Sequence, residues 1–301
     1  MADGPRVTVV IPTYNRAALL MEAIESALAQ SYRDLEVLVC DDGSTDDTAA
    51  RVKALDARVR YERLTHTGRP GSPRNRGIEA ARGELIAFLD DDDLWDPDKL
   101  ASQIEIMDEQ GLNVVYTDRL LLPEDGSRSE RVTTPALASP HRLLDLVLAG
   151  HFPHLCTMLA DRELLRAVGG FDETLMTGED LDLCLRLSPI ARAGRVPEPL
   201  VTIRRRPESL SNSSASEAFG NAIGVLERAL ATQAMVRTQR RICRTTLSAL
   251  NVRLAALMLQ DGDQPGARRA ALGAVHYRPV SRSAWIALAE AISSGGGRRK
   301  S

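Results

Sequence analysis

Hydrophobic and polar positions follow two alternating patterns along the first hundred residues. Short runs rich in β-branched and other apolar residues predict buried strands. These runs are Arg6–Pro12 (RVTVVIP), Leu35–Cys40 (LEVLVC), Val59–Leu64 (VRYERL) and Glu84–Leu89 (ELIAFL). Apolar residues between the strands recur at helical spacing, as in NRAALLMEAIESALAQS, for which Asn15 is the predicted N-cap. This alternation predicts a three-layer α/β/α domain with a mainly parallel sheet.

Three polar clusters come directly after predicted strands. They are TYNR (Thr13–Arg16), DDGS (Asp41–Ser44) and DDDD (Asp90–Asp93). Asp96 and Pro97 then have the types expected at the N-cap and first position of another helix. Because ligands of such sheets bind beyond the carboxyl ends of the strands, we expect one crevice to collect the three clusters.

The pattern changes in the second half of the chain. Shorter apolar runs at NVVYTD and LCTMLAD predict further strands, and a helix is predicted to begin at Glu179. After about Ser211, long Ala/Leu/Arg periodicity without strands predicts helices, with a turn at DGDQPG. We therefore expect a domain over residues 1–211, a helical C-terminal extension over 217–294 and a disordered tail over 295–301.

Composition narrows the class of protein. The 301 residues include 44% hydrophobic residues and have a formal net charge of −3, so no nucleic-acid partner is expected. The four cysteines lack metal-ligand spacing, which favours reduced thiols in a cytoplasmic protein over a zinc site or disulfides. We recognise neither a signal peptide nor an apolar run of about 18 residues, but attachment to a membrane surface stays open.

The four consecutive aspartates need an explanation, because neighbouring like charges repel. One reading is a solvated acidic loop before a helix. The other is a hard divalent cation, which prefers oxygen ligands and often binds through one or two carboxylates plus phosphate oxygens. The position of the cluster behind a buried strand favours the metal.

The other polar groups have two readings each. Asp42 belongs to a turn that caps a helix, or it accepts hydrogen bonds from a nucleobase or ribose. Tyr14 packs, or it stacks on a base. Acids at the helix start Gly178–Asp180 favour the helix dipole, or one of them is a general base. His151 and His154 flank a proline in HFPH, so we expect no metal pair there.

Four segments occur together in a familiar order: VTVVIPTYNR, LEVLVCDDGSTDDT, PRNRGIEAARGELIAFLDDDDLWDPDKL and GGFDETLMTGEDLDLCLRL. Together they closely resemble the inverting family-2 glycosyltransferases from about Arg6 to Ser211. The resemblance implies the Rossmann-like, A-type glycosyltransferase fold. It also implies transfer of a sugar from a nucleotide-diphosphate sugar, most commonly a UDP sugar, to an acceptor hydroxyl with inversion. The acceptor would be a glycan, a lipid-linked sugar, a protein or a small molecule, in polysaccharide or glycoconjugate biosynthesis.

The resemblance also implies roles for donor-site residues. Pro12 and Tyr14 would border the nucleotide pocket, and Asp42 would hold the base. Arg69 would approach the base or the phosphates. Asp91 would lie near the ribose or the metal.

Metal and catalytic roles follow from the same resemblance. Asp90 and Asp92 form the DxD motif, in which Asp92 would contact Mn²⁺ or Mg²⁺ directly. Asp180 matches the catalytic base, with Glu179 beside it as a further diphosphate or acceptor contact.

The stretch IRRRPESLS departs from the family pattern. Relatives often carry a histidine that helps to bind the metal or diphosphate where this chain has Arg206. An arginine cannot ligate a metal, but Arg204 and Arg206 can pair with phosphate oxygens.

Two other classes compete with a glycosyltransferase. A nucleotidyltransferase would show a Gly- and Arg-rich loop after the first strand, which PTYNRAALL lacks. A catalytically degenerate nucleotide-binding scaffold would use its helical tail for protein interaction, but the intact DxD and ED motifs argue against it. The expected location is the cytoplasm, with the inner face of the membrane as an option.

Overall fold

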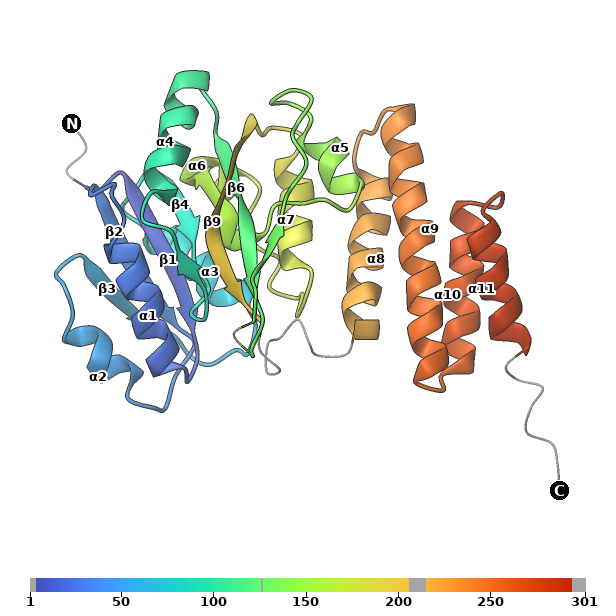
Figure 1. The fold of residues 1–301 in the computed structure, drawn as a ribbon, viewed down its shortest axis with the longest axis horizontal. Coiled ribbons are helices and arrows are strands. Elements are labelled where there is room, and N and C mark those ends of the chain that lie inside the picture. The colour runs from blue at the N-terminus through green and yellow to red at the C-terminus, as the bar shows by residue number, and fades with distance from the viewer. Residues whose placement is uncertain (1–3, 126, 206–214, 294–301) are drawn as a thin grey trace. The chain divides into compact units, whose positions relative to one another are not determined.

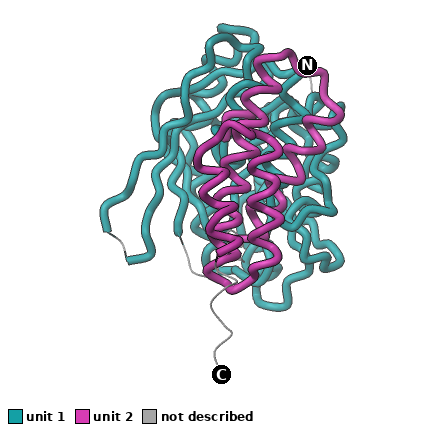
Figure 2. The backbone as a smooth tube through the Cα atoms, turned by 90° about the vertical axis from the view of Figure 1, so that its right-hand side faces the viewer, with its two compact units in different colours: residues 1–147, 151–207 teal, residues 148–150, 208–301 magenta. Residues whose placement is uncertain are grey.

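The computed structural model describes residues 4–125, 127–205 and 215–293 (Figure 1). The chain divides into two compact units, which Figure 2 distinguishes by colour. The sheet unit comprises Met1–Val147 and His151–Pro207, and the helical unit comprises Leu148–Gly150 and Glu208–Ser301. The expected boundary at residue 211 and the expected tail over 295–301 lie outside the described residues.

The sheet unit is built on one nine-stranded sheet with strand order β3-β2-β1-β4-β8-β6-β9-β5, in which β7 pairs with β6. The strands are β1 (Val7–Thr13), β2 (Leu35–Asp41), β3 (Val59–Arg63), β4 (Leu85–Phe88), β5 (Leu94–Trp95), β6 (Val114–Leu122), β7 (Glu130–Val132), β8 (Met158–Asp161) and β9 (Ala193–Arg204). The first four predicted strands form a parallel block, β3-β2-β1-β4. Strand β8 runs antiparallel to both β4 and β6, while β6 and β9 are parallel.

Helices cover the sheet as the alternation predicts, and the α/β class is confirmed. They are α1 (Ala17–Leu28), α2 (Thr48–Lys53), α3 (Gly71–Ala80), α4 (Lys99–Gln110), α5 (Leu143–Leu148), α6 (Arg162–Ala167) and α7 (Glu179–Leu187), with a 3-10 turn at Leu155–Thr157. Alternate residues of β1 point to opposite faces. Val9 belongs to a core cluster with Leu20 of α1 and Leu100 of α4. Val10 faces α3, where a Cβ on Gly77 would come within 2.2 Å of it.

Two predicted helix starts are wrong. Asn15 is not the N-cap of α1, which is Arg16. Asn15 has φ 53°, and its side chain instead accepts a hydrogen bond from the Thr45 backbone N–H at 2.7 Å.

Asp96 is not the N-cap of α4, which begins at Lys99 after the N-cap Asp98. The N–H of Asp96 donates to the Leu200 carbonyl, and the Asp96 carbonyl accepts from the Gln30 amide and from the Lys99 N–H. The Asp96 carboxylate accepts from the Asp98 N–H at 3.1 Å.

The helical unit contains α8 (Ala215–Thr232), α9 (Arg237–Gln260), α10 (Gln264–Tyr277) and α11 (Arg282–Ser293). The turn predicted at DGDQPG separates α9 from α10, and Asp263 caps α10 by accepting from the Gly266 N–H at 2.9 Å. Among the described residues, α9 is the one helix whose length and composition would allow it to cross a membrane. It packs against α8, α10 and α11.

Candidate active site

The acidic turn (Asp90–Asp93) joins the end of β4 to the short strand β5. Asp91 is buried, and its carboxylate accepts hydrogen bonds from the Thr13 hydroxyl (2.7 Å) and the Arg16 guanidinium (3.2 Å). Arg16 also reaches Asp92 at 3.3 Å.

Thr13 ends β1 and Arg16 is the N-cap of α1, so the TYNR cluster meets the acidic turn. TYNR also meets the DDGS turn, because the Asn15 N–H donates to the Ser44 hydroxyl at 2.8 Å and the Asp42 N–H donates to the Thr13 carbonyl at 2.9 Å. The three predicted polar clusters therefore lie together.

Arg74 connects the acidic turn to the start of α7. Its guanidinium donates to the Asp90 carboxylate at 2.6 Å and to the Glu179 carboxylate at 3.1 Å. Arg74 is buried on α3, where the two carboxylates compensate the cost of desolvating its charge. One guanidinium therefore holds together residues that lie about ninety positions apart in the chain.

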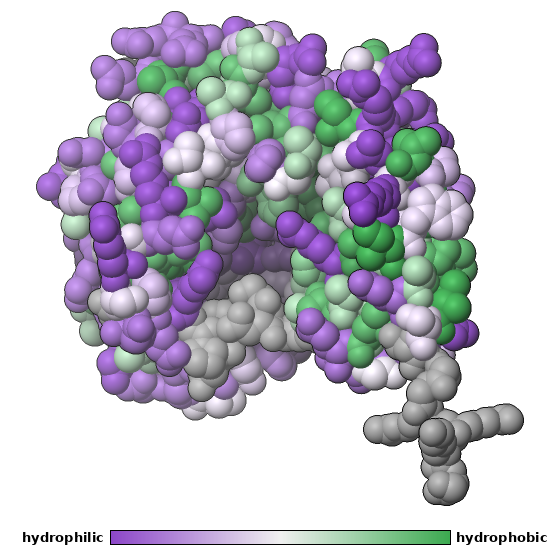
Figure 3. Space-filling view, turned by 45° about the vertical axis from the view of Figure 1, so that its right-hand side comes forward, coloured by the Kyte–Doolittle hydropathy of each residue, from purple (hydrophilic) through white to green (hydrophobic). Residues whose placement is uncertain are grey.

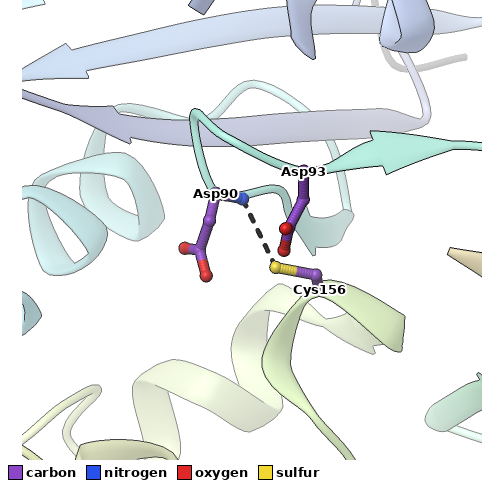
Figure 4. Close-up of side chains that lie close together, drawn as sticks. All are labelled: Asp90, Asp93 and Cys156. Carbon is purple, nitrogen blue, oxygen red and sulfur yellow. Dashed lines mark hydrogen bonds between the residues drawn. The ribbon is translucent and has the colours of Figure 1, made fainter. Parts of the chain in front are cut away.

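Asp93 and Cys156 complete the buried side of the acidic turn (Figure 4). A ligand atom from each of Asp90, Asp93 and Cys156 lies within 4.8 Å of the others. The Asp90 backbone N–H donates to the Cys156 sulfur at 3.4 Å, and Asp93 accepts from the Arg204 backbone N–H at 3.2 Å. Burial, together with the nearby charges of Asp90 and Asp92, holds the pKa of Asp93 well above its usual range.

Burial affects the charge of the turn. It raises the pKa of Asp91 to about 6, although Thr13 and Arg16 oppose that shift. In the described part of the chain, Arg16 pairs with Asp91 and Asp92, and Arg74 pairs with Asp90. Clustered carboxylate oxygens are the ligands that a hard divalent cation such as Mn²⁺ or Mg²⁺ prefers.

Asp180 lies in the first turn of α7, beside Glu179. Its carboxylate accepts a hydrogen bond from the Leu181 backbone N–H at 2.7 Å. Burial and the negative charge of Glu179 raise the pKa of Asp180 to about 7, while Arg74 opposes that increase. A carboxylate with a pKa near neutrality is a suitable general base for a hydroxyl group.

Sequence reasoning missed two groups that surround these acids. His154 lies close enough to Asp90 for their charges to interact, and its Nδ1 atom is buried without a hydrogen-bond partner. Burial lowers the pKa of His154 to about 4, so the imidazole is neutral at pH 7. Arg119 of β6 interacts electrostatically with Asp180, and its Nε atom is also buried and unpaired.

The DDGS turn (Asp41–Ser44) occupies the end of β2. Asp42 accepts hydrogen bonds from the backbone N–H groups of Thr67 (2.9 Å) and Gly68 (2.8 Å). The Nδ1 atom of His66 lies 3.0 Å from the same carboxylate. Gly43 has φ +87°, and a Cβ there would lie 3.0 Å from His66. The turn and the loop over 66–68 therefore form one closely packed unit.

The predicted nucleotide contacts lie around this unit. Tyr14 follows β1, and its half-exposed ring stacks on His66 with the centroids 4.1 Å apart and the planes 19° apart. Pro12 is the penultimate residue of β1 and lies opposite Cys40 in the register. The exposed side chain of Arg69 donates to the Thr174 carbonyl at 2.8 Å, which connects this loop to the segment before α7.

Arg204 and Arg206 are the two predicted diphosphate contacts in the IRRR stretch. Arg204 ends β9, and its guanidinium pairs with Glu22 of α1, while only its backbone N–H reaches Asp93. Arg206 lies outside the described residues.

A family model matches the part of the chain that holds most of these residues. A profile of the family described as glycosyl transferase family 2 matches residues 8–169. This region holds β1, the DDGS turn, Arg74 and the acidic turn, and it spans more than half of the chain.

Curated relatives show the same kinship. Succinoglycan biosynthesis protein ExoO of Rhizobium meliloti is 39% identical over 201 residues, which cover 64% of this chain and 57% of that protein. Chondroitin synthase of Escherichia coli is 31% identical over 190 residues, which cover 62% of this chain and 27% of that protein. An uncharacterised Sinorhizobium fredii protein is 34% identical over 234 residues, 25% of its length. The chain thus spans only part of the length of these relatives.

Solved structures share the fold over nearly the whole chain. Staphylococcus aureus TarS 1–349 in complex with UDP-GlcNAc superposes with a TM-score of 0.70 at 18% identity, covering 98% of this chain and 93% of that one. The mannosyltransferase PcManGT of Pyrobaculum calidifontis, in complex with GDP-Man and Mn²⁺, gives a TM-score of 0.62 at 20% identity, covering 96% and 80%. These likenesses concern the fold, whereas the profile match over residues 8–169 concerns the sequence itself. The chain belongs to glycosyl transferase family 2.

Proposed function

We propose that the protein transfers a sugar from a nucleotide-diphosphate sugar, with UDP as the nucleotide, to an acceptor hydroxyl with inversion. The observation that carries the proposal is the Arg74 bridge. By pairing with Asp90 and Glu179, Arg74 joins the acidic turn to the start of α7, which supports a single site that includes Asp180. Such a site can hold a donor diphosphate and an acceptor at the same time.

The donor nucleotide lies along the ends of β1 and β2 in this proposal. Tyr14 and Pro12 border the base, Asp42 accepts its hydrogen bond, and Asp91 faces the ribose. Because His66 already lies 3.0 Å from the Asp42 carboxylate, a base that bonds to Asp42 displaces His66 from that oxygen. Arg69 is exposed beside the same loop and can turn towards the phosphates.

Asp92 and Asp90 would hold Mn²⁺ or Mg²⁺, and the cation would supply positive charge for the departing diphosphate. The clustering of ligand atoms from Asp90, Asp93 and Cys156 within 4.8 Å of one another supports this assignment. PcManGT, which shares the fold, binds GDP-Man with Mn²⁺. Asp90 would share its carboxylate between the cation and Arg74. Arg206 and, once released from Glu22, Arg204 are additional diphosphate contacts in this proposal.

Asp180 removes the proton from the acceptor hydroxyl in the proposed mechanism. The acceptor oxygen that loses this proton forms a bond to the anomeric carbon. At the same time, the bond between the anomeric carbon and the diphosphate oxygen breaks on the opposite face. A single displacement of this kind inverts the anomeric configuration. Glu179 lies beside the base and, through Arg74, fixes the start of α7 against the acidic turn.

The acceptor is a hydroxyl of a growing glycan, a lipid-linked sugar or a small molecule. ExoO is named for succinoglycan biosynthesis and the Escherichia coli relative for chondroitin synthesis, which supports polysaccharide or glycoconjugate assembly. We place the reaction in the cytoplasm, at the inner face of the membrane. Residues 1–211 form the catalytic domain, and 217–294 form an extension.

Calorimetric titration of UDP, GDP and dTDP, with and without Mn²⁺, tests the donor site. We expect Mn²⁺-dependent binding of UDP that is lost in Asp92→Asn. Asp98→Asn is the matched control, because Asp98 is an exposed acid six residues further along that makes no side-chain cap to α4. If folded protein bound none of the nucleotides, the scaffold hypothesis would replace the enzyme hypothesis.

A further inference from the structure

Helix α11 buries small apolar residues and exposes large ones, which is the reverse of the usual arrangement. Its buried residues are the alanines Ala284, Ala287 and Ala291. Trp285 and Ile286 are exposed by 52% and 47%. An amphipathic helix of a soluble domain normally buries its large apolar side chains and exposes polar ones. The outer face of α11 therefore has the composition of a contact surface.

The same hairpin carries further exposed apolar side chains. Leu272 of α10 is 56% exposed, Val280 of the connecting loop 86% and Ile292 of α11 56%. Five of the ten exposed large hydrophobic residues in the described part of the chain thus fall between positions 272 and 292. Figure 3 shows hydrophobic side chains on the exposed surface of the helical unit. Scattered apolar residues are ordinary on a surface, but such clustering marks an interaction site.

This apolar surface of the α10–α11 hairpin is accompanied by positive charge. Between Gln264 and Ser293 the chain has four exposed arginines and one acidic residue, Glu290. The arginines are Arg268, Arg269, Arg278 and Arg282. Arg268 donates from its Nε atom to the Ala291 carbonyl at 3.0 Å, which places it at the end of α11 next to Ile292. At least one of these cations, Arg268, is therefore a neighbour of an exposed apolar residue, Ile292.

We propose that the apolar surface of the α10–α11 hairpin binds the anionic face of a lipid bilayer. Arginine together with Trp and Ile is the composition by which helices lie in a membrane interface, with anionic headgroups attracting the cations. The inference adds a specific surface to the membrane location included in the proposed function. Binding itself does not depend on sugar transfer.

Charge and shape favour a bilayer over a second copy of the chain. A self-complementary dimer would bring the four arginines of one hairpin against those of the other, which is unfavourable. Val280 projects from a loop with most of its side chain exposed. A fluid interface accepts such projections without a complementary pocket.

Vesicle co-sedimentation of the full chain tests this surface. The probes are phosphatidylcholine vesicles with and without phosphatidylglycerol. We expect at least about tenfold stronger binding to the anionic vesicles, and weaker binding as salt is raised. Trp95 is buried, so a blue shift of tryptophan emission on vesicle addition reports Trp285.

Two surface variants separate the contributions. Ile286→Ser/Ile292→Ser removes apolar area from an exposed face, and we expect about tenfold weaker binding. Arg278→Glu/Arg282→Glu should abolish the preference for anionic vesicles. Ile190→Ser is the matched control, because Ile190 is 50% exposed but belongs to the sheet unit.

Three outcomes would overturn the proposal. Equal binding to both kinds of vesicle would exclude anionic lipid, and equal effects of Ile190→Ser and the hairpin variant would exclude this surface. A dimer in sedimentation velocity that becomes a monomer in Ile286→Ser/Ile292→Ser would assign the surface to a second copy. An Asp180→Asn variant that still binds vesicles shows that this result is independent of the proposed transfer reaction.

Discussion

Two turns of the sheet unit, the DDGS turn and the acidic turn, have similar sequences but different hydrogen-bond and ion-pair partners. Both follow a buried parallel strand, and both start with adjacent aspartates. In the DDGS turn, neutral donors satisfy Asp42 through the N–H groups of Thr67 and Gly68. In the acidic turn, arginines contact the carboxylates, and burial keeps the pKa of Asp91 near 6.

The difference indicates two kinds of binding task. The Asp42 carboxylate keeps lone pairs beyond those that accept from the N–H groups of Thr67 and Gly68, so it suits a further hydrogen bond from a neutral donor such as a nucleobase. A cluster of carboxylates suits a divalent cation, which prefers oxygen ligands. We therefore propose that the DDGS turn recognises the base and that the acidic turn binds charge. The following predictions test that division.

Asp180 lies outside both turns, so its removal should affect chemistry without donor binding. We expect Asp180→Asn to lower turnover by about two to four orders of magnitude while leaving the nucleotide affinity unchanged. In the unmodified enzyme, turnover should fall as pH drops below about 7, because Asp180 must be deprotonated to act as a base. Release of the nucleotide from the donor, followed against pH, measures both. A variant with undiminished turnover would remove Asp180 from the mechanism.

Substitution in the two turns should separate charge binding from recognition. Asp92→Asn should abolish the effect of Mn²⁺ on UDP affinity. Asp42→Asn should weaken UDP binding by about tenfold, with and without Mn²⁺, because it alters one hydrogen bond to the base. Calorimetry of the two variants side by side provides the measurement. Loss of Mn²⁺ dependence in Asp42→Asn would contradict the division of roles.

The free energy of unfolding, measured without metal, should change in opposite directions in Asp91→Asn and Asp42→Asn. Asp91→Asn should raise the free energy of unfolding at pH 7 by about 1–2 kcal/mol, because it removes a buried carboxylate with a raised pKa. Asp42→Asn should lower it by about 1–2 kcal/mol, because the charge-assisted bonds to the loop weaken. Urea unfolding with a chelator present, in a Trp285→Phe background, lets Trp95 report on the sheet unit alone.

The raised pKa of Asp91 predicts how the free energy of unfolding changes with pH. Its pKa is about 6 in the folded chain, against an ordinary value of 3.8, so the folded state binds more protons between pH 4 and 6. The contribution of Asp91 to stability therefore decreases as pH rises through that window and is constant above it. Asp91→Asn should lose this dependence, and Asp42→Asn should keep it.

Substitution of His66 should have the smallest effect on UDP affinity. It lies against Asp42 and stacks on Tyr14, so it competes with a base for both. We expect His66→Ala to tighten UDP binding by about twofold to fivefold, measured by the same calorimetry. Tighter binding that persists in an Asp42→Asn background would show that His66 acts through Tyr14 instead. Weaker binding would mean that His66 contacts the nucleotide.

The sequence predicted much of the fold because local patterns carry it. Buried β-branched runs identified β1, β2 and β4, and the polar residues after them marked the site. The antiparallel direction of β8 was not predictable, because strand direction depends on how the chain crosses the sheet. The helix start at Asn15 failed for a related reason. Its side chain found a partner distant in the sequence, Thr45.

The missed site residues have burial in common. Arg74 lies in PRNRG, an arginine-rich segment typical of a solvated helix, yet it is 7% exposed and bridges two carboxylates. The HFPH sequence indicates no metal pair for His154, whereas the fold brings its imidazole within electrostatic reach of Asp90, Arg119 and Arg74. Partners this distant leave no local signal.

The buried alanines of the α10–α11 hairpin have a consequence for local unfolding. Alanine side chains allow close helix packing, but each removes little apolar area from water. These alanines are Ala267, Ala270, Ala271, Ala274, Ala284, Ala287 and Ala291. The hairpin should therefore open at a lower free energy than the sheet, and its amides should exchange hydrogen earlier. A bilayer that binds Trp285 would raise the free energy at which the hairpin opens. Protection of α11 against hydrogen exchange would therefore report whether the hairpin is bound to a membrane.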